Sequence, residues 1–158
     1  MIRKIYIDMD GVLADFERGC VEMFPMERFE WTEDKWEDMK RFPHFYRDLK
    51  PMEGAIEMMT ELMKRFGDRV EILSAVPKKE RGIPFASQDK LDWVKEWIPG
   101  ELKVNLVLRD EKINYCTCSD DILIDDYDIN IHEWREKGGT GILFVSPEKV
   151  MEQINQKS

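Results

Sequence analysis

Two aspartates two residues apart stand where a short apolar run near the N-terminus ends. The run KIYI (4–7) leads into Asp8 and Asp10, and Gly11 follows directly. Side chains at positions i and i+2 of a strand share one side, and a glycine lets the chain turn sharply away. A carboxylate at the end of a buried strand is costly without a compensating partner, so the pair indicates a bound ion or substrate. Taken alone, the pattern is also an ordinary turn signal.

Polar side chains follow three later apolar runs in the same way. They are Ser74 after 70–73, Arg109 and Lys112 after 104–108, and Asp125 and Asp126 after 122–124. Each of them alone could cap a backbone group or form a turn. In open parallel sheets, however, ligands bind just outside the carboxyl ends of the strands, so the four strand ends together predict one site. The neighbouring acidic residues are interpreted as a solvated flank: Asp120, Asp121 and Asp128.

The converging carboxylates require a cation. Two like charges about 4 Å apart repel by roughly 4 kcal/mol at an effective dielectric constant near 20, and they raise one another's pKa. The available ligands are hard oxygens, which favours Mg²⁺ over zinc or copper. Cys116 and Cys118 would make half of a zinc site, but only Cys20, His44 and His132 remain to complete it. We therefore expect magnesium and cysteines that pack as small apolar groups.

The elements that position these residues follow from the apolar pattern. Five short runs rich in Ile, Leu and Val predict buried strands, at 4–7, 70–73, 104–108, 122–124 and 142–145. Helical patterns lie at 53–66, 87–98, 129–137 and from Pro147 onward, with Ser146 as N-cap of the last. This alternation predicts an α/β fold with a doubly wound, mainly parallel five-stranded sheet.

Two of the predicted helices carry explicit buried faces. In 53–66 the face consists of Ile56, Met59, Met63 and Phe66. In 87–98 it consists of Leu91, Val94 and Ile98, with Ser87 as the predicted N-cap.

Residues 16–50 interrupt the alternation. They carry no strand signal, yet they are too long and too aromatic for an ordinary loop. We interpret 16–50 as a small helical cap inserted after the first strand, and 1–15 with 51–158 as the α/β core. Aromatic side chains at near-helical spacing are more often a small hydrophobic core than a binding surface, so both roles stay open for this segment.

Composition limits the partners. The 158 residues carry a formal net charge of −9, which argues against binding a nucleic-acid polymer or an anionic membrane surface. Three cysteines give no disulfide framework, and the charged N-terminal stretch is too short in apolar residues for a signal peptide. We expect a cytoplasmic protein, a monomer or homodimer, that acts on a small molecule.

The ordered series of motifs resembles the haloacid dehalogenase (HAD) superfamily, in the form found in 5'(3')-deoxyribonucleotidases. DMDGVLADF (8–16) resembles the first motif, and FYRDLKPMEGA (45–55) the return from cap to core. ILSAVPK (72–78) resembles the second motif, and KLDWVKEWI (90–98) the helix after it. LVLRDEK (106–112) and DILIDD (121–126) resemble the third and fourth motifs. The likeness covers most of the chain.

The resemblance implies an Mg²⁺-dependent phosphatase with a HAD-like Rossmannoid core. Asp8 would be the nucleophile that forms an aspartyl-phosphate, and Asp10 the acid and base. Asp8, the backbone carbonyl of Asp10 and Asp126 would hold the ion, with Asp125 in support. The implied phosphate-binding groups are Ser74 and one of three cations: Lys112, which we favour, Lys90 or Arg109.

Substrate choice is expected to lie in the cap. Phe16 occupies the position where the family stacks a base, and Trp31, Trp36 and Phe45 are further candidates for base contact. The expected substrate is a nucleoside monophosphate, deoxypyrimidine ones first. The alternatives are a phosphatase of sugar phosphates or other small phosphomonoesters, and a phosphate-binding regulatory module without turnover. Retention of both aspartates speaks against the last, because a binding module does not need the acid.

Overall fold

The computed structural model describes residues 1–24, 26 and 28–158. Its centre is a five-stranded sheet in the order β3-β2-β1-β4-β5, with every neighbouring pair parallel. The strands are β1 (Lys4–Ile7), β2 (Val70–Ala75), β3 (Lys103–Val107), β4 (Asp121–Asp125) and β5 (Thr140–Leu143). The order runs outward from β1 in both directions, which makes the strand ends beside β1 the topological switch point where such folds bind ligands.

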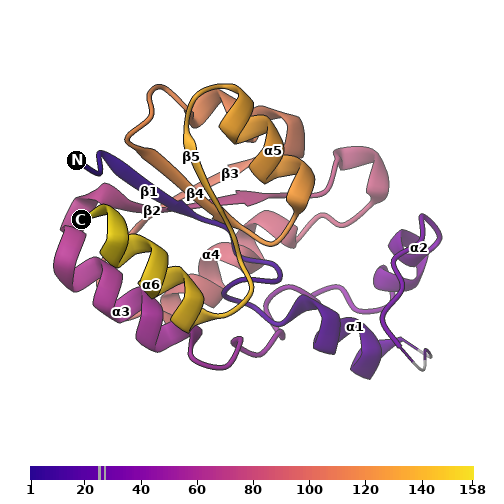
Figure 1. The fold of residues 1–158 in the computed structure, drawn as a ribbon. Coiled ribbons are helices and arrows are strands. Elements are labelled where there is room, and N and C mark those ends of the chain that lie inside the picture. Colours follow the sequence, from indigo (N-terminus) through magenta and orange to yellow (C-terminus); the bar gives the residue numbers. More distant parts are fainter. Residues whose placement is uncertain (25, 27) are drawn as a thin grey trace.

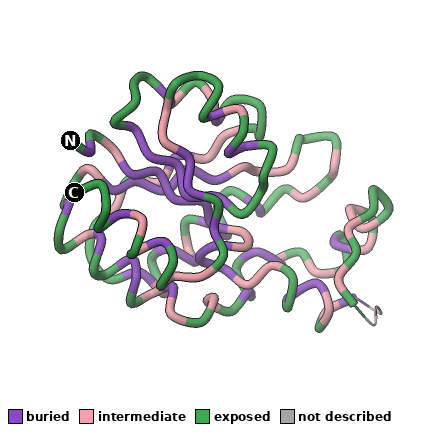
Figure 2. Tube along the Cα trace, viewed as in Figure 1, coloured by how far each residue is buried: buried purple, intermediate pink, exposed green. Residues whose placement is uncertain are grey.

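Helices cover both faces of the sheet (Figure 1). α3 (Ala55–Phe66), α4 (Ala86–Trp97) and α6 (Pro147–Lys157) pack on one face, in a core that includes Ile5 and Ile7. α5 (Asp128–Glu136) packs on the other face, against Tyr6. Alternate residues of β1 thus serve opposite layers, and the strands form the buried centre in Figure 2. The predicted doubly wound α/β fold is confirmed.

Three short 3-10 turns complete the core. They are η1 (Gly67–Arg69), η2 (Lys79–Arg81) and η3 (Arg109–Tyr115). The last of these follows β3 and carries Lys112 back under the ends of β1 and β4. Among the residues described, no helix is both long and apolar enough to cross a membrane.

The segment 16–50 leaves the core and returns to it at adjacent points. The Asp15 amide donates to the Lys50 carbonyl at 2.8 Å, and the Met52 amide donates to the Leu13 carbonyl at 2.7 Å. Between them lie α1 (Phe16–Met23) and α2 (Lys35–Met39), which project to one side of the sheet (Figure 1). Phe45 and other buried side chains of this segment belong to the same hydrophobic cluster as the sheet. That the segment acts as a separate cap stays a prediction.

Several details of the helices differ from the sequence predictions. α4 begins at Ala86 after Phe85, so Ser87 is not its N-cap, and Leu91 is 41% exposed. Val94 and Ile98 are buried as predicted. Trp93 and Lys90 extend the buried face, and Lys90 reaches Ser74 and Ala75 at the end of β2. Ser146 does cap α6, accepting the Lys149 amide at 3.2 Å.

The buried face of α3 also differs from the prediction. It consists of Ala55, Met58, Met59, Leu62 and Phe66, so Ile56 and Met63 lie at its margins.

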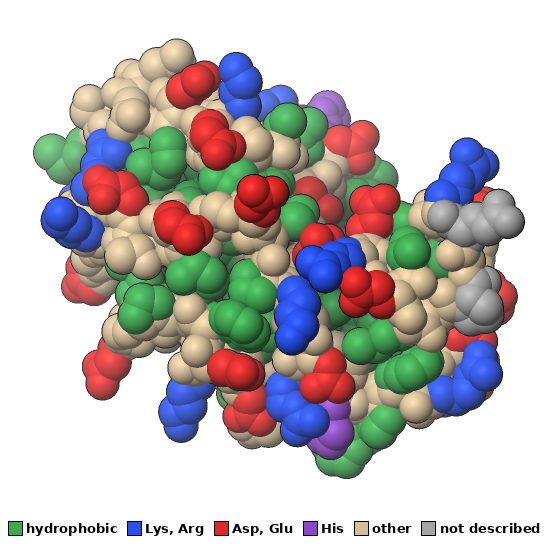
Figure 3. All heavy atoms as spheres, turned by 90° about the horizontal axis from the view of Figure 1, so that it is seen from below, with side chains coloured by type: hydrophobic (Ala, Val, Ile, Leu, Met, Phe, Trp, Pro, Cys, Tyr) green, Lys and Arg blue, Asp and Glu red, His purple; other side chains and the backbone are tan. Residues whose placement is uncertain are grey.

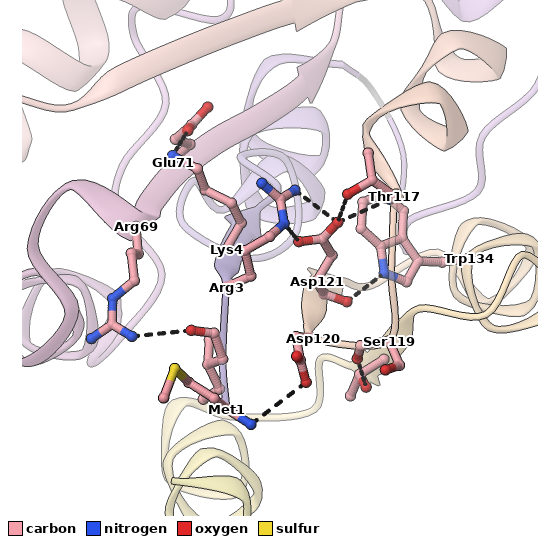
Figure 4. A network of polar contacts seen from close by, with 12 residues as sticks. Met1, Arg3, Lys4, Arg69, Glu71, Thr117, Ser119, Asp120, Asp121 and Trp134 are labelled. Carbon is pink, nitrogen blue, oxygen red and sulfur yellow. Dashed lines mark hydrogen bonds and ion pairs between the residues drawn. The ribbon is translucent and has the colours of Figure 1, made fainter.

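Asp121, interpreted from the sequence as solvated, is fully buried at the amino-terminal edge of the sheet (Figure 4). Its carboxylate accepts two hydrogen bonds from Arg3, at 2.6 and 2.8 Å, and others from the amide and hydroxyl of Thr117. Burial alone would raise the pKa of Asp121, but these donors lower it on balance below its ordinary value. Asp121 is buried because it is the first residue of β4, and Arg3, which precedes β1, lies beside it.

Candidate active site

The first aspartate follows β1 in register with the end of β4. The Asp8 amide donates to the Ile124 carbonyl at 3.0 Å, which places Asp8 beside Asp125. After Asp8 the chain folds into a tight turn in which the amides of Val12, Leu13 and Ala14 all point at the carbonyl of Met9. The turn keeps Asp8 buried at 6% exposure and leaves Asp10 on the wall of an open cavity.

Lys112 bridges the two buried carboxylates. Its ammonium lies 2.9 Å from Asp8 Oδ1 and 2.9 Å from Asp125 Oδ2. Asp125 also accepts hydrogen bonds from the Tyr127 amide at 2.9 Å and the Asn130 side chain at 3.0 Å. Burial alone would lower the pKa of Lys112, but the two carboxylates raise it above its ordinary value, so the ammonium stays charged. Both carboxylate oxygens of Asp125 therefore accept hydrogen bonds. Asp8 accepts the bond from Lys112 with Oδ1 only, which leaves its other oxygen free to react.

Asp126 completes an acidic cluster at the exposed side of this pair. Asp8, Asp125 and Asp126 each offer a carboxylate oxygen, and the three atoms lie within 4.8 Å of one another. Burial, and after it the charge of Asp125, raise the pKa of Asp8 well above its ordinary value despite the pull of Lys112. The same two causes raise the pKa of Asp126 to about 7. The single positive charge of Lys112 does not balance the negative charges of three carboxylates. Carboxylate oxygens at this spacing are hard donors, which fit Mg²⁺.

Gly11 makes room for the cluster. Its φ is +80°, in the left-handed region, and a Cβ built on it would lie 2.0 Å from Oδ2 of Asp126. Glycine is therefore required at this position for two reasons. The backbone has a positive φ, and the Asp126 carboxylate occupies the space that a Cβ would need.

Lys90 and Ser74 lie together on the other side of Asp10. The Lys90 ammonium donates to Oδ2 of Asp10 at 2.8 Å and to the Ser74 hydroxyl at 2.8 Å. Neither Lys90 nor Ser74 is among the residues that line the cavity, and both are buried, at 1% and 0% exposure. The structure thus brings five predicted site residues to the same edge of the sheet: Asp8, Asp10, Ser74, Lys90 and Lys112. The two lysines contact different carboxylates: Lys90 contacts Asp10, and Lys112 contacts Asp8 and Asp125.

A cavity of about 750 Å³ opens from the two catalytic candidates toward the segment 16–50. Its floor includes Asp8, Asp10, Asp126 and Lys112, and its rim includes Arg109. The Arg109 guanidinium lies 3.2 Å from Asn130 Oδ1 and 3.7 Å from Glu133, which ties it to α5. Arg109 thus lines the cavity while its guanidinium is held by side chains of α5.

The aromatic wall of the cavity differs from the prediction in one residue. Phe16, Trp31 and Trp36 line it as expected. Phe45 does not: it is 1% exposed and packed among the rings of Phe16, Phe24 and Tyr46, so its predicted base contact is wrong. Tyr46, its neighbour, lines the cavity instead.

Asn130 is the polar site residue that sequence reasoning missed. It holds Asp125 from the first turns of α5, and at 6% exposure it is buried beside the cluster. A buried amide one helical turn behind an acidic strand end is the kind of signal that could have identified it, but DYDIN (126–130) reads on its own as a polar helix start.

Comparison with known proteins places the chain in a family. The family model described as "5' nucleotidase, deoxy (Pyrimidine), cytosolic type C protein" matches residues 1–155. A protein of Vibrio phage KVP40 named for 5'(3')-deoxyribonucleotidase activity is 31% identical over 138 residues, 87% of this chain and 69% of that protein. The human mitochondrial 5'(3')-deoxyribonucleotidase is 27% identical over 150 residues, 78% of this chain and 61% of that protein. The human cytosolic type is 27% identical over 148 residues, 79% of this chain and 71% of that protein. The chain thus spans about two thirds of the length of these relatives.

Solved structures give the same fold at low sequence identity. L-2-haloacid dehalogenase from Xanthobacter autotrophicus has a TM-score of 0.55 at 13% identity, covering 100% of this chain and 84% of that one. A HAD family enzyme from Bacteroides thetaiotaomicron, in complex with magnesium and inorganic phosphate, has a TM-score of 0.53 at 16% identity, covering 90% and 94%. The predicted HAD-like architecture is confirmed.

Proposed function

We propose that this chain, which belongs to the family of deoxy (pyrimidine) 5' nucleotidases of the cytosolic C type, is a phosphatase of nucleoside monophosphates, deoxypyrimidine ones first. Nucleotidases are phosphoric monoester hydrolases, and the site has the groups that such hydrolysis needs. The observation that carries the proposal is the position of Asp8: a buried carboxylate held by Lys112, with one oxygen free, on the floor of a cavity whose walls are aromatic.

Asp8 is the proposed nucleophile. In the first step its free oxygen forms a bond to phosphorus, the bond to the leaving oxygen breaks, and the proton on Asp10 goes to that oxygen. In the second step water attacks phosphorus, a proton of that water returns to Asp10, and the bond to Asp8 breaks. Lys112 orients Asp8 throughout and meets the negative charge of the phosphate, because its ammonium already lies 2.9 Å from Asp8 Oδ1.

Asp8, Asp126 and the backbone carbonyl of Asp10 are the residues that would hold Mg²⁺, with Asp125 fixing Lys112 behind them. When bound, the ion would offset the repulsion between the phosphate dianion and this acidic pocket and stabilise charge in the transition state. The fit rests on the carboxylate oxygens that lie within 4.8 Å of one another and on the raised pKa of Asp126.

The aromatic wall is the proposed site of the base. Phe16 lies 5.5 Å from Trp31 and 6.1 Å from Phe29 between ring centroids, and all three line the cavity. Trp36, which also lines the cavity, lies 4.9 Å from Trp31 between ring centroids. A cavity of about 750 Å³ falls within the range of pockets that enclose small molecules. We infer that the segment 16–50 acts as the cap that supplies this wall.

The surface gives no support to a polymer as substrate. The chain carries a net charge of −9, and on the face seen in Figure 3 basic side chains are scattered among acidic ones. A nucleic-acid backbone requires a continuous basic footprint. We propose a small-molecule substrate and a cytoplasmic compartment, the latter supported by the relative of cytosolic type.

A phosphate-release screen with Mg²⁺ tests the proposal. The substrates are ribo- and deoxynucleoside monophosphates, sugar phosphates and an aryl phosphate, and the variants are Asp8→Asn and Asp10→Asn. We expect deoxynucleotide turnover that both variants lose. A wide preference for sugar phosphates would replace the substrate class, and magnesium-dependent binding without turnover would indicate a regulatory module. Full activity in Asp8→Asn would refute the nucleophile.

A further inference from the structure

Lys90 is a buried cation that the proposed reaction has not yet used. It lies on α4, its side chain is 1% exposed, and its ammonium donates to Asp10 Oδ2 at 2.8 Å, Ser74 Oγ at 2.8 Å and the Ala75 carbonyl at 2.7 Å. A lysine ammonium has three protons. All three are therefore committed to the protein, and none is left for a phosphate oxygen.

The surroundings of Lys90 separate it from the cavity. Its ammonium lies 4.7 Å from the centroid of the Tyr46 ring, and Tyr46, unlike Lys90, lines the cavity. The ring stands on the cap side, while Ser74 and Ala75 at the end of β2 lie on the other. A cation over an aromatic face is stabilised where water is excluded. Lys90 is thus enclosed between cap and core, in contact with one catalytic candidate only.

The two oxygens of Asp10 have different environments. Oδ2 accepts the bond from Lys90, whereas Oδ1 is buried and has no hydrogen-bond partner among the described residues. The side chain as a whole is 26% exposed and belongs to the cavity wall. A buried carboxylate oxygen without a partner is unfavourable in the free protein. Among the described residues, the bond from Lys90 is therefore the hydrogen bond that fixes the orientation of the Asp10 carboxylate.

We propose that Lys90 is a positioning residue: its ammonium holds the Asp10 carboxylate at the cavity wall, in the orientation from which Asp10 delivers its proton to the leaving oxygen of the substrate. The inference rests on the proposed function and assigns the two lysines different roles. Lys112 serves the nucleophile Asp8, and Lys90 serves the acid Asp10. The same orientation presents the Asp10 carboxylate to the attacking water in the second step.

This role differs from the phosphate-binding role that the sequence left open for Lys90. A phosphate ligand would stabilise every phosphomonoester alike, whereas a residue that orients the acid matters in proportion to how much the leaving group needs a proton. An alcohol leaving group, as in a nucleotide, needs the proton. p-Nitrophenolate leaves as a stable anion and does not.

The test compares kcat/KM for a nucleoside monophosphate and for p-nitrophenyl phosphate, because kcat/KM covers the steps through departure of the leaving group. In Lys90→Met we expect a loss of about 100-fold or more on the nucleotide and less than about tenfold on p-nitrophenyl phosphate, in line with typical contributions of general acids. Asp10→Asn should show the same pattern. Lys95→Met, at an exposed position of the same helix, is the matched control and should change neither value.

A double-variant cycle separates positioning from general destabilisation. If Lys90 acts through Asp10, the combination Lys90→Met with Asp10→Asn should fall within about threefold of Asp10→Asn alone. Lys90→Gln, which keeps a donor without the charge, serves in the same comparison if the methionine variant does not fold. Equal losses on both substrates, or losses that multiply in the double variant, would overturn the inference.

Failure of the proposed function would look different. A wild-type protein that hydrolyses neither substrate would remove both the function and the role of Lys90. A wild-type protein that turns over both, together with a Lys90→Met variant that keeps the wild-type ratio of kcat/KM values, would remove the role of Lys90 alone.

Discussion

Replacement of Gly11 by alanine should lower activity, because the added Cβ would displace the Asp126 carboxylate. A Cβ at this position would lie 2.0 Å from Oδ2 of Asp126 and 2.5 Å from its Cγ, whereas real Cβ contacts essentially never fall below 3.0 Å. The carboxylate oxygen must therefore retreat by about 1 Å, the difference between the first and last of these distances, and a misplacement of that size can cost about 100-fold in rate. We expect Gly11→Ala to lose at least that much kcat/KM.

The change also strains the backbone, and a control removes that effect from the comparison. Gly11 has φ of +80°, where alanine costs roughly 1–2 kcal/mol, or about 2–8 °C in melting temperature for a chain of this size. Gly138 has φ of +103°, and a Cβ there would meet nothing within 4 Å. Gly138→Ala should therefore lose comparable stability and keep its activity.

Two assays check this prediction: phosphate release, and the rise in melting temperature that Mg²⁺ produces. Ligand binding to the folded state stabilises it by mass action, so the rise reports the affinity of the site for the ion. We expect Mg²⁺ to stabilise wild type and Gly138→Ala alike, and Gly11→Ala much less. Wild-type activity and an undiminished rise in Gly11→Ala would refute the reasoning about Asp126, and so would an equal loss of activity in Gly138→Ala.

Three further changes have definite expected results. Lys112→Met should lower the free energy of unfolding without Mg²⁺ by roughly 3–5 kcal/mol in urea titrations, because it leaves buried carboxylates unpaired; an unchanged midpoint would contradict this. Asp121 has a pKa below its ordinary 3.8, so its contribution to stability is full above that pH and is lost as pH falls further. Asp121→Asn should therefore be less stable than wild type at pH 7, with a gap that narrows in acid; a constant gap would mean that the charge is irrelevant. Phe16→Ala should raise KM for nucleotides while KM for p-nitrophenyl phosphate stays near the wild-type value, and parallel increases would argue against a base platform.

The sheet and the strand-end carboxylates were predictable because both follow from local patterns. Short runs of Ile, Leu and Val mark the strands, and parallel pairing brings their ends to one edge, so Asp8 and Asp125 could be placed together without coordinates. Boundaries shifted by one or two residues, as at the start of β5, where Thr140 and Gly141 pair before the apolar run begins.

What the sequence did not reveal depends on tertiary contacts. The two lysines near the site look alike along the chain, and only the fold shows that one reaches Asp8 and the other Asp10. Phe45 and Tyr46 both pack against Phe16 of α1, and only the fold shows that Tyr46 lines the cavity while Phe45 does not. The burial of Asp121 was also missed, because an acidic residue beside a predicted strand is usually solvated. Only the fold shows that Arg3 pairs with it.

The most direct test is to trap the phosphoryl group on the protein. The wild-type enzyme is mixed with Mg²⁺ and a nucleoside monophosphate labelled in its phosphate, quenched in acid, and its peptides are analysed by mass spectrometry. Label should be found on Asp8 and be absent in Asp8→Asn. With p-nitrophenyl phosphate labelled in its phosphate, whose leaving group needs no proton, label should increase in Asp10→Asn because mainly the second step slows. Label on any other residue, or a burst of released nucleoside with no labelled peptide, would contradict the account.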